Sequence, residues 1–130
     1  MVVNLYLPSE LTLEVEKLLE MEPHWVAPLL WRSEFRNILA LYLRKGLIDF
    51  ETACNMQSEA EILMGENEFN MESVSVLTIA AQSGCSAYDS EFVSLAKSLQ
   101  TKLVTADKKL LTVFPDIAIS AHDYLTTHGD

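Results

Sequence analysis

Stretches with helical spacing alternate along this chain with apolar runs of only a few residues, and this alternation constrains the fold most strongly. Helices are expected where apolar residues recur at helical spacing between caps, glycines and prolines: residues 11–21, 29–46, 50–65, 74–84, 90–100 and 108–114. Strands are expected at residues 24–27, 103–105 and 117–119, with 68–71 as a strand or an extended link. Short apolar strands separated by helices are typical of a parallel sheet covered on both faces, so the sequence predicts an α/β domain.

The length of 130 residues is that of one domain, and the content of 49% hydrophobic and 22% charged residues is typical of a globular protein. We therefore expect a single domain over residues 1–130. The longest apolar runs, residues 26–31 and 38–43, are much shorter than the roughly 20 residues that a membrane-crossing helix needs. Because no secretory signal pattern is recognisable, the expected location is the cytoplasm.

The net charge is difficult to combine with nucleic-acid binding. Nine lysines and arginines against 19 aspartates and glutamates give a formal charge of −10. A generic nucleic-acid binder instead has a basic footprint, because neutralisation of phosphates supplies most of its affinity. If this chain acts on RNA, the attraction must come from bound cations, a local basic patch or a partner.

The cysteines and histidines do not form a recognisable zinc or nucleophile motif. Cys54 and Cys85 are far apart in the sequence and are interpreted as small core residues rather than as a disulfide. His24, His122 and His128 are scattered and have no partner at metal-ligand spacing, which favours surface or loop positions.

Three acidic residues lie where the functional groups of a parallel sheet gather. Asp107 directly follows the strand expected at residues 103–105, and Asp89 opens a helix. Glu34 lies on the apolar stripe of a long helix, where an unpaired carboxylate is costly. Because the carboxyl ends of parallel strands share one edge, these acids could converge there. Carboxylate oxygens are the ligands that Mg²⁺ and Mn²⁺ prefer.

Each of these acids also has a purely structural interpretation. Asp89 and Asp107 could be N-caps, which is the commonest role of an aspartate before a helix. Glu34 could be a solvated acid that pairs with Arg32 or Arg36, which flank it in the sequence. The spacing of the residues alone leaves both interpretations open.

The segment GCSAYDSEFVSLAKSLQTKLVTADKKL, residues 84–110, resembles the C-terminal half of a PIN domain, and especially that of VapC-like toxins. In that family a Tyr-Asp pair opens a helix, and a following strand ends in Thr-x-Asp before Lys-Lys-Leu. The matching residues here are Tyr88, Asp89, Thr105 and Asp107.

A second segment, residues 27–48, is similar to the family motif in which a glutamate on a long helix is followed three positions later by asparagine. The matching residues are Glu34 and Asn37. The resemblance covers roughly residues 5 to 120. It implies a PIN-like three-layer αβα domain with a central, mostly parallel sheet flanked by helices.

The activity that this resemblance implies is metal-dependent endonucleolytic cleavage of RNA. Glu34, Asp89 and Asp107 are then the catalytic residues and hold one or two Mg²⁺ or Mn²⁺ ions, which activate a water for attack on the scissile phosphate. Asn37 is a supporting residue. Thr105 could hydrogen-bond an acid or a substrate oxygen, or be an ordinary β-branched strand residue.

Local basic residues offer contacts to phosphate in spite of the acidic total. Arg32 and Arg36 flank Glu34, whereas Lys108 and Lys109 follow Asp107. All four could equally be solvated helix charges. Because the two arginines are four residues apart and share a helix face, they could instead clamp the glutamate.

The chain departs from the family pattern at its start, MVVNLYLPSE. The family's first acid normally ends an N-terminal strand, and this segment is more similar to the interior of the following helix. The favoured interpretation is that the strand and its aspartate are missing. In the other interpretation, residues 1–5 are a degenerate strand with Asn4 in place of the acid. A catalytically impaired PIN scaffold or interaction module is therefore the alternative function.

The resemblance also implies partners. A toxin of this kind is held inactive by an antitoxin, and a basic antitoxin tail would suit an acidic cleft. A homodimer is expected as well, because the apolar helix faces exceed the needs of one small core. These faces include Trp31, Phe35, Leu39 and Tyr42, which could equally be ordinary core residues.

Overall fold

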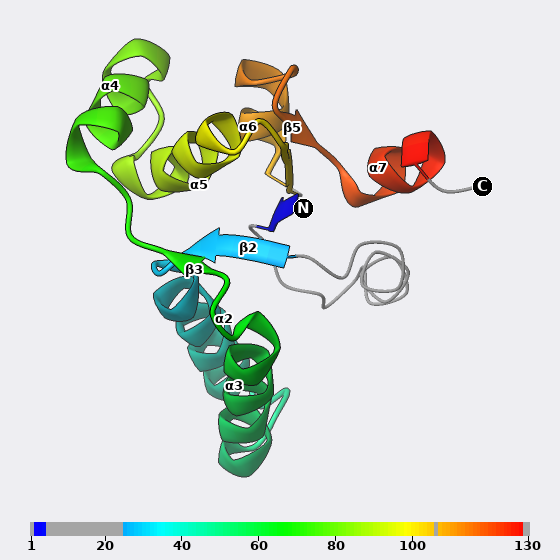
Figure 1. Ribbon diagram of the computed structural model, residues 1–130. Coiled ribbons are helices and arrows are strands. Elements are labelled where there is room, and N and C mark those ends of the chain that lie inside the picture. The colour runs from blue at the N-terminus through cyan, green and yellow to red at the C-terminus, as the bar shows by residue number, and fades with distance from the viewer. Residues whose placement is uncertain (1, 5–24, 106, 129–130) are drawn as a thin grey trace.

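A computed structural model of the chain describes residues 2–4, 25–105 and 107–128 (Figure 1). The helix expected at residues 11–21 and the side chain of His24 lie outside the described residues. Five short strands form one sheet in the order β3-β2-β1-β4-β5, and every neighbouring pair is parallel. The strands are β1 (Val2–Asn4), β2 (Trp25–Pro28), β3 (Glu68–Phe69), β4 (Lys102–Val104) and β5 (Ala118–Ile119).

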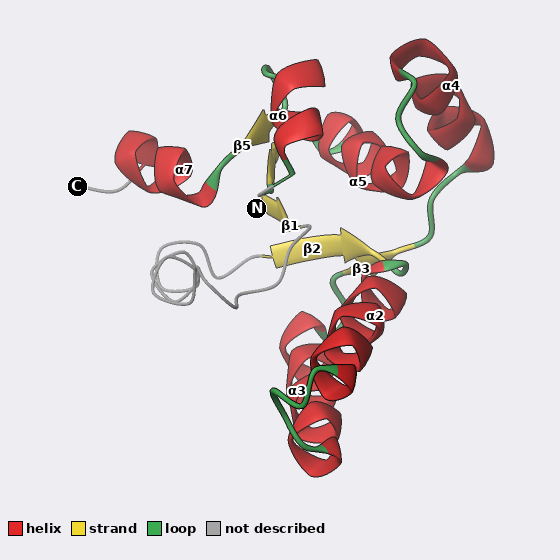
Figure 2. Ribbon diagram, turned by 180° about the vertical axis from the view of Figure 1, so that it is seen from behind, coloured by secondary structure: helices red, strands yellow, loops and turns green. Residues whose placement is uncertain are grey.

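Helices lie on both sides of these strands. They are α2 (Trp31–Arg44), α3 (Phe50–Met64), α4 (Ser73–Ser83), α5 (Ala87–Ser98), α6 (Lys108–Val113) and α7 (Ala121–His128). Figures 1 and 2 show α2 and α3 on one side of the strands and α4 and α5 on the other. Helix α5 packs against β1, β2 and β4, whereas α3 packs against α2 and β2. The fold is mixed α/β, as expected, and the arrangement fits an αβα domain.

The first strand corrects the favoured interpretation of the N-terminus. Residues Val2–Asn4 form β1, which is the central strand of the five. Val3 aligns with Val26 of β2 on one side, and Asn4 aligns with Val104 of β4 on the other. A strand is therefore present at residues 2–4, contrary to the favoured interpretation, and the place of Asn4 as the counterpart of the family's first acid stays a prediction.

Local capping chemistry explains where several helices begin and end. The Asp49 carboxylate accepts a hydrogen bond from the Thr52 amide at 2.8 Å and begins α3, as predicted. Gly84 ends α4 in the left-handed region, with φ of 74°, which a glycine adopts without strain. Pro28 ends β2 instead of opening the following helix, because α2 starts three residues later.

The core is centred on α5, which is buried on most of its surface. Phe92, Val93 and Ala96 are at most 1% exposed and pack with the strands and with α4. Cys85 is buried, as expected, whereas Cys54 is exposed and the expectation that it is a core residue was wrong. Both cysteines are free thiols.

The apolar face of α2 belongs in large part to this same core. Trp31 and Leu39 are buried within the chain, so these two residues do not form an exposed dimer surface. Phe35 is half-buried and meets the Trp31 ring edge to face, with 5.8 Å between ring centroids. Among the described helices, none combines the length and hydrophobicity that crossing a membrane requires.

Candidate functional site

All five strands run parallel, so their carboxyl ends meet at one edge of the sheet. The first turn of α2 follows β2 there, and the start of α6 follows β4. Helix α5 leads into the amino end of β4, so its own first turn lies back at the carboxyl edge. Four acids on these three elements are called the acidic row below: Glu34, Glu91, Asp89 and Asp107.

Glu34 is half-buried in the first turn of α2. Burial raises the pKa of Glu34 above its usual value, and the negative charges of Asp89 and Glu91 raise it further. Both of those acids are on α5, so the first turns of α2 and α5 face each other closely enough for their carboxylates to repel. The structure therefore brings together two acids that the sequence placed 55 positions apart.

Asp89 links this pair to the start of α6. Burial raises the pKa of Asp89, and the negative charge of Asp107 raises it further, whereas the Ser86 hydroxyl and the Lys109 ammonium act in the opposite direction. The Asp89 side chain is not the N-cap of α5, because Ser86 takes that role and accepts a hydrogen bond from the Asp89 amide at 3.0 Å. The N-cap interpretation of Asp89 was therefore wrong.

Asp107 is an N-cap, as its structural interpretation predicted. One carboxylate oxygen accepts hydrogen bonds from the amides of Lys109 at 2.8 Å and Leu110 at 3.2 Å. The Asp107 amide in turn donates to the hydroxyl of Thr105 at 3.0 Å. Thr105 is fully buried, so it does not contact a substrate and instead holds the backbone that carries Asp107. The second carboxylate oxygen of Asp107 is not part of this cap.

Sequence motifs did not single out Glu91, the fourth member of the acidic row. It lies two residues after Asp89, and burial raises the pKa of its carboxyl group. Its neighbours could have pointed to Glu91, because Ser90, Phe92 and Val93 around it are all buried. An acid in a helix that is otherwise buried is costly unless something pairs with it.

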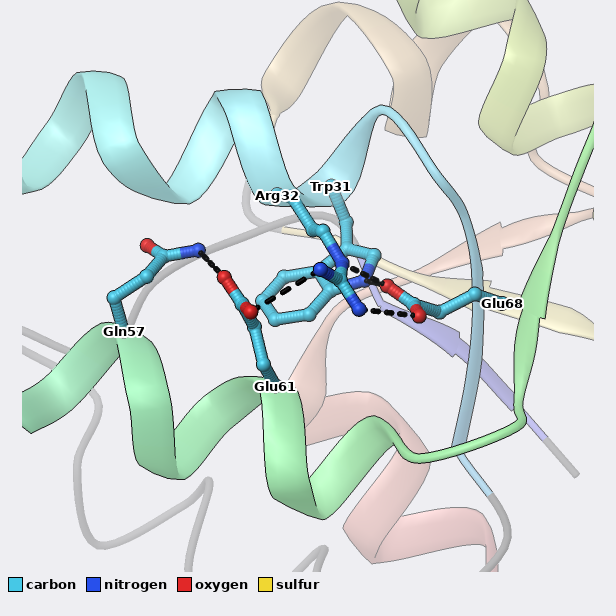
Figure 3. A network of polar contacts seen from close by, with 5 residues as sticks. All are labelled: Trp31, Arg32, Gln57, Glu61 and Glu68. Carbon is cyan, nitrogen blue, oxygen red and sulfur yellow. Dashed lines mark hydrogen bonds and ion pairs between the residues drawn. The ribbon is translucent and has the colours of Figure 1, made fainter.

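A second group of acids is paired with Arg32 in the first turn of α2 (Figure 3). The Arg32 guanidinium donates to both carboxylate oxygens of Glu68, at 2.6 and 2.8 Å, and to Glu61 at 3.1 Å. The Trp31 indole N–H donates to Glu68 at 2.7 Å, and the Gln57 amide donates to Glu61 at 2.8 Å. We call these five residues the paired network. The hydrogen bonds from Arg32 and Trp31 hold the pKa of Glu68 below its usual value.

The paired network corrects the expected role of Arg32. Arg32 neither clamps Glu34 nor is free to contact phosphate, because its guanidinium is held by Glu61 and Glu68. Two residues along a helix differ by about 200° in direction, so Arg32 and Glu34 point to opposite sides of α2. Arg36, Asn37 and Lys108 are exposed, and their expected supporting roles stay predictions.

The chemistry of the acidic row fits a divalent cation held by few protein ligands. Within residues 2–4, 25–105 and 107–128, no three acidic, histidine or cysteine side chains are grouped closely enough to enclose a metal ion. Mg²⁺ does not require such a cage, since it usually keeps several waters and is bound through one or two carboxylates. The carboxylates of Glu34 and Asp89 are a suitable donor pair, since burial and then the charge of Asp89 raise the pKa of Glu34.

Comparison of the sequence with known proteins points in part to the same family as the sequence motifs. The sequence matches no protein-family model. It is similar to Ribonuclease VapC3 of Pyrobaculum aerophilum, with 27% identity over 127 residues that cover 88% of this chain and 89% of that protein. This similarity suggests a VapC-like family. The similarity extends over most of the length of both chains, which is wider than the two segments that carry the sequence motifs.

Proposed function

We propose that this chain is a metal-dependent endoribonuclease and the toxin of a VapBC-type toxin–antitoxin pair, with a PIN-like three-layer fold. The single observation that carries the proposal is the acidic row. Its members lie on elements that start at the carboxyl edge of a parallel sheet, where burial raises the pKa of Glu34 and of Asp89, and the charge of Asp89 raises that of Glu34 further. The similarity to a protein named as a VapC ribonuclease supports the same reaction class.

In the proposed reaction the carboxylates of Glu34 and Asp89 would hold Mg²⁺ or Mn²⁺ at the edge of the sheet, and Asp107 would be the third acid beside them. When bound, such an ion supplies an activated water and offsets the charge that develops on the phosphate. The residues of the chain keep the three carboxylates in position. Ser86 caps the helix that carries Asp89, and Thr105 fixes the backbone at Asp107.

Partners follow from the same proposal. The net charge of −10 favours a basic antitoxin, because opposite charges speed encounter and select the partner. The exposed apolar side chains of Val74 and Leu77, one turn apart on α4, support a protein-contact surface that a homodimer or the antitoxin would cover.

One observation favours a second candidate, a PIN-like scaffold without activity. The central strand β1 ends in Asn4, at the position where the resembled family has its first acid. An amide is neutral and a weaker ligand for a hard cation than a carboxylate. The scaffold would keep the fold and its partners but would not cleave RNA.

Cleavage of single-stranded RNA by the purified chain separates the two candidates. We expect cleavage in Mn²⁺, no cleavage in EDTA, and a loss of roughly 100-fold or more in the Glu34→Gln variant, which loses a ligand charge. Glu59→Gln is the matched control. It removes an exposed acid of α3 that does not belong to the acidic row, and it should retain activity. Equal activity of wild type and Glu34→Gln, or no cleavage by the wild type, would contradict the proposed nuclease.

A further inference from the structure

Lys109 contacts Asp107 of the acidic row and the loop that leads into α5. Its backbone amide donates to the carboxylate of Asp107 at 2.8 Å, and its ammonium group donates to the carbonyl oxygen of Gly84 at 3.3 Å. Gly84 ends α4 and is followed two residues later by Ser86, the N-cap of α5. The ammonium group therefore lies beside the first turn of α5, which carries Asp89.

Two other cations of the described residues are engaged elsewhere. Arg32 is held by Glu61 and Glu68 in the paired network. Lys102 begins β4, so it lies at the amino edge of the sheet, where its ammonium donates to the carbonyl of Asp116 at 2.8 Å. Of the four basic residues that the sequence offered as phosphate contacts, Arg32 is paired elsewhere, whereas the ammonium group of Lys109 bonds a carbonyl next to the start of α5.

The row repels a polyanion, and a cation beside it reduces that repulsion. The bond from Lys109 to the Gly84 carbonyl is long and involves a neutral acceptor, and the side chain is exposed. An anionic phosphate oxygen is a stronger acceptor for an ammonium group than a neutral carbonyl. Exchange of the carbonyl for a phosphate is therefore favourable and needs no rearrangement of the backbone.

We propose that Lys109 is a substrate-positioning residue, whose ammonium group binds a backbone phosphate of RNA lying over the acidic row. The inference rests on the proposed nuclease function and names the residue that carries the positive charge of the site. A lysine acts here as a mobile point charge, which suits a contact to backbone rather than to bases. The contact is consequently independent of RNA sequence.

The test compares three variants in Mn²⁺-dependent cleavage of a labelled single-stranded RNA of random sequence. Lys109→Met removes the charge and keeps the apolar stem, whereas Lys109→Arg keeps the charge. Lys102→Met is the matched control, since it removes the same charge from a lysine that also binds a backbone carbonyl, but at the opposite edge of the sheet. Folding of each variant is checked by circular dichroism.

We expect Lys109→Met to raise KM roughly tenfold, as for loss of one charged hydrogen bond, with little change in kcat. The dependence of log kcat/KM on log salt should become shallower by about 0.7, which corresponds to one phosphate contact on a single strand. Lys109→Arg should restore KM, and Lys102→Met should match the wild type. In calorimetry without RNA, Mn²⁺ affinity of Lys109→Met should be unchanged or tighter, because a neighbouring positive charge is gone.

The outcomes separate this inference from the proposed function. Equal KM values for Lys109→Met and Lys102→Met would overturn the role of Lys109 while the nuclease function stands. Weaker Mn²⁺ binding by Lys109→Met would also overturn it, because it would show that the lysine merely supports the shape of the row. A wild-type chain that neither binds Mn²⁺ nor cleaves RNA would overturn the proposed function, and this inference with it.

Discussion

Two groups of acids lie on opposite sides of the first turn of α2, and they differ in how their charge is balanced. In the paired network, Glu68 accepts hydrogen bonds from Arg32 and Trp31, which hold its pKa low. In the acidic row, burial and neighbouring negative charges raise the pKa of Glu34. The first turn of α2 thus lies between acids whose charge is balanced by hydrogen-bond donors of the chain and acids whose charge is not balanced.

The difference indicates which group is structural and which is functional. Acids that are satisfied within the fold contribute to its stability and leave little affinity for a ligand. Acids that repel one another in a partly buried place destabilise the fold unless a cation binds, and perturbed groups of this kind cluster at functional sites. The comparison therefore supports a structural role for the paired network and the proposed ligand-binding role of the acidic row.

The largest stability difference is expected between Glu68→Ala and Glu91→Ala. The first variant leaves the Trp31 indole and the Arg32 guanidinium without their shared acceptor and should lower the free energy of unfolding by about 1 to 3 kcal/mol. The second removes an acid from the row and should change it by less than about 0.5 kcal/mol, or increase it. Urea denaturation measures both. Equal losses would remove the distinction between the two groups.

A smaller effect is expected at the end of the row, where the fold itself holds Asp107. Thr105→Val keeps the shape of the buried side chain but leaves the Asp107 amide without an acceptor, at a cost of about 1 kcal/mol. Thr112→Val, on the exposed side of α6, is the control and should be nearly neutral. An unchanged unfolding midpoint in Thr105→Val would show that the hydroxyl does not hold this loop.

The smallest expected effect is the pH dependence of the free energy of unfolding. Its sign distinguishes the two groups of acids most specifically. The raised pKa of Glu34 means that its contribution to stability is greatest below 4.5 and is lost as pH rises through the folded-state pKa. The lowered pKa of Glu68 has the opposite consequence, with stability present above 4.5 and lost as pH falls through the folded-state pKa.

Unfolding of Glu34→Gln and Glu68→Gln, measured between about pH 4 and 7, checks this sign. Relative to the wild type, Glu34→Gln should gain stability as pH rises, and Glu68→Gln should lose it. The change for Glu34 should stay below about 1 kcal/mol, because a half-exposed charge is screened by solvent. The same slope for both variants would contradict the assignment of opposite electrostatic environments.

Much of the fold could be predicted from the sequence because its signals are local. Asp49, Gly84 and Asp107 mark helix ends by capping chemistry that needs only neighbouring residues. Strands β2, β3, β4 and β5 were also predicted close to their observed positions, whereas β1 was not the favoured interpretation. The strand Val2–Asn4 gains its place from parallel neighbours that are distant in sequence, a kind of information that local patterns do not carry.

Three acids of the candidate site and Lys109 were candidates from the sequence, whereas Glu91 and the partners of the cations were not. Glu34, Asp89 and Asp107 followed from motifs and from the expected carboxyl edge of the sheet. The partner of Arg32 is Glu68, 36 residues away, and no local spacing could identify it in preference to the adjacent Glu34. The position of the Lys109 ammonium likewise depends on a contact with Gly84, 25 residues earlier in the chain.

Calorimetric titration of the wild type and of Asp89→Asn with Mn²⁺ tests the central claim most directly. Asp89 is the acid of the row that interacts electrostatically with both Glu34 and Asp107. The account predicts saturable binding of Mn²⁺ by the wild type and an affinity lower by more than about 100-fold in Asp89→Asn. Loss of a residue that only supports a metal ligand would lower the affinity less. Absence of binding by the wild type, or equal binding by both proteins, would contradict the claim that the acidic row is a cation site.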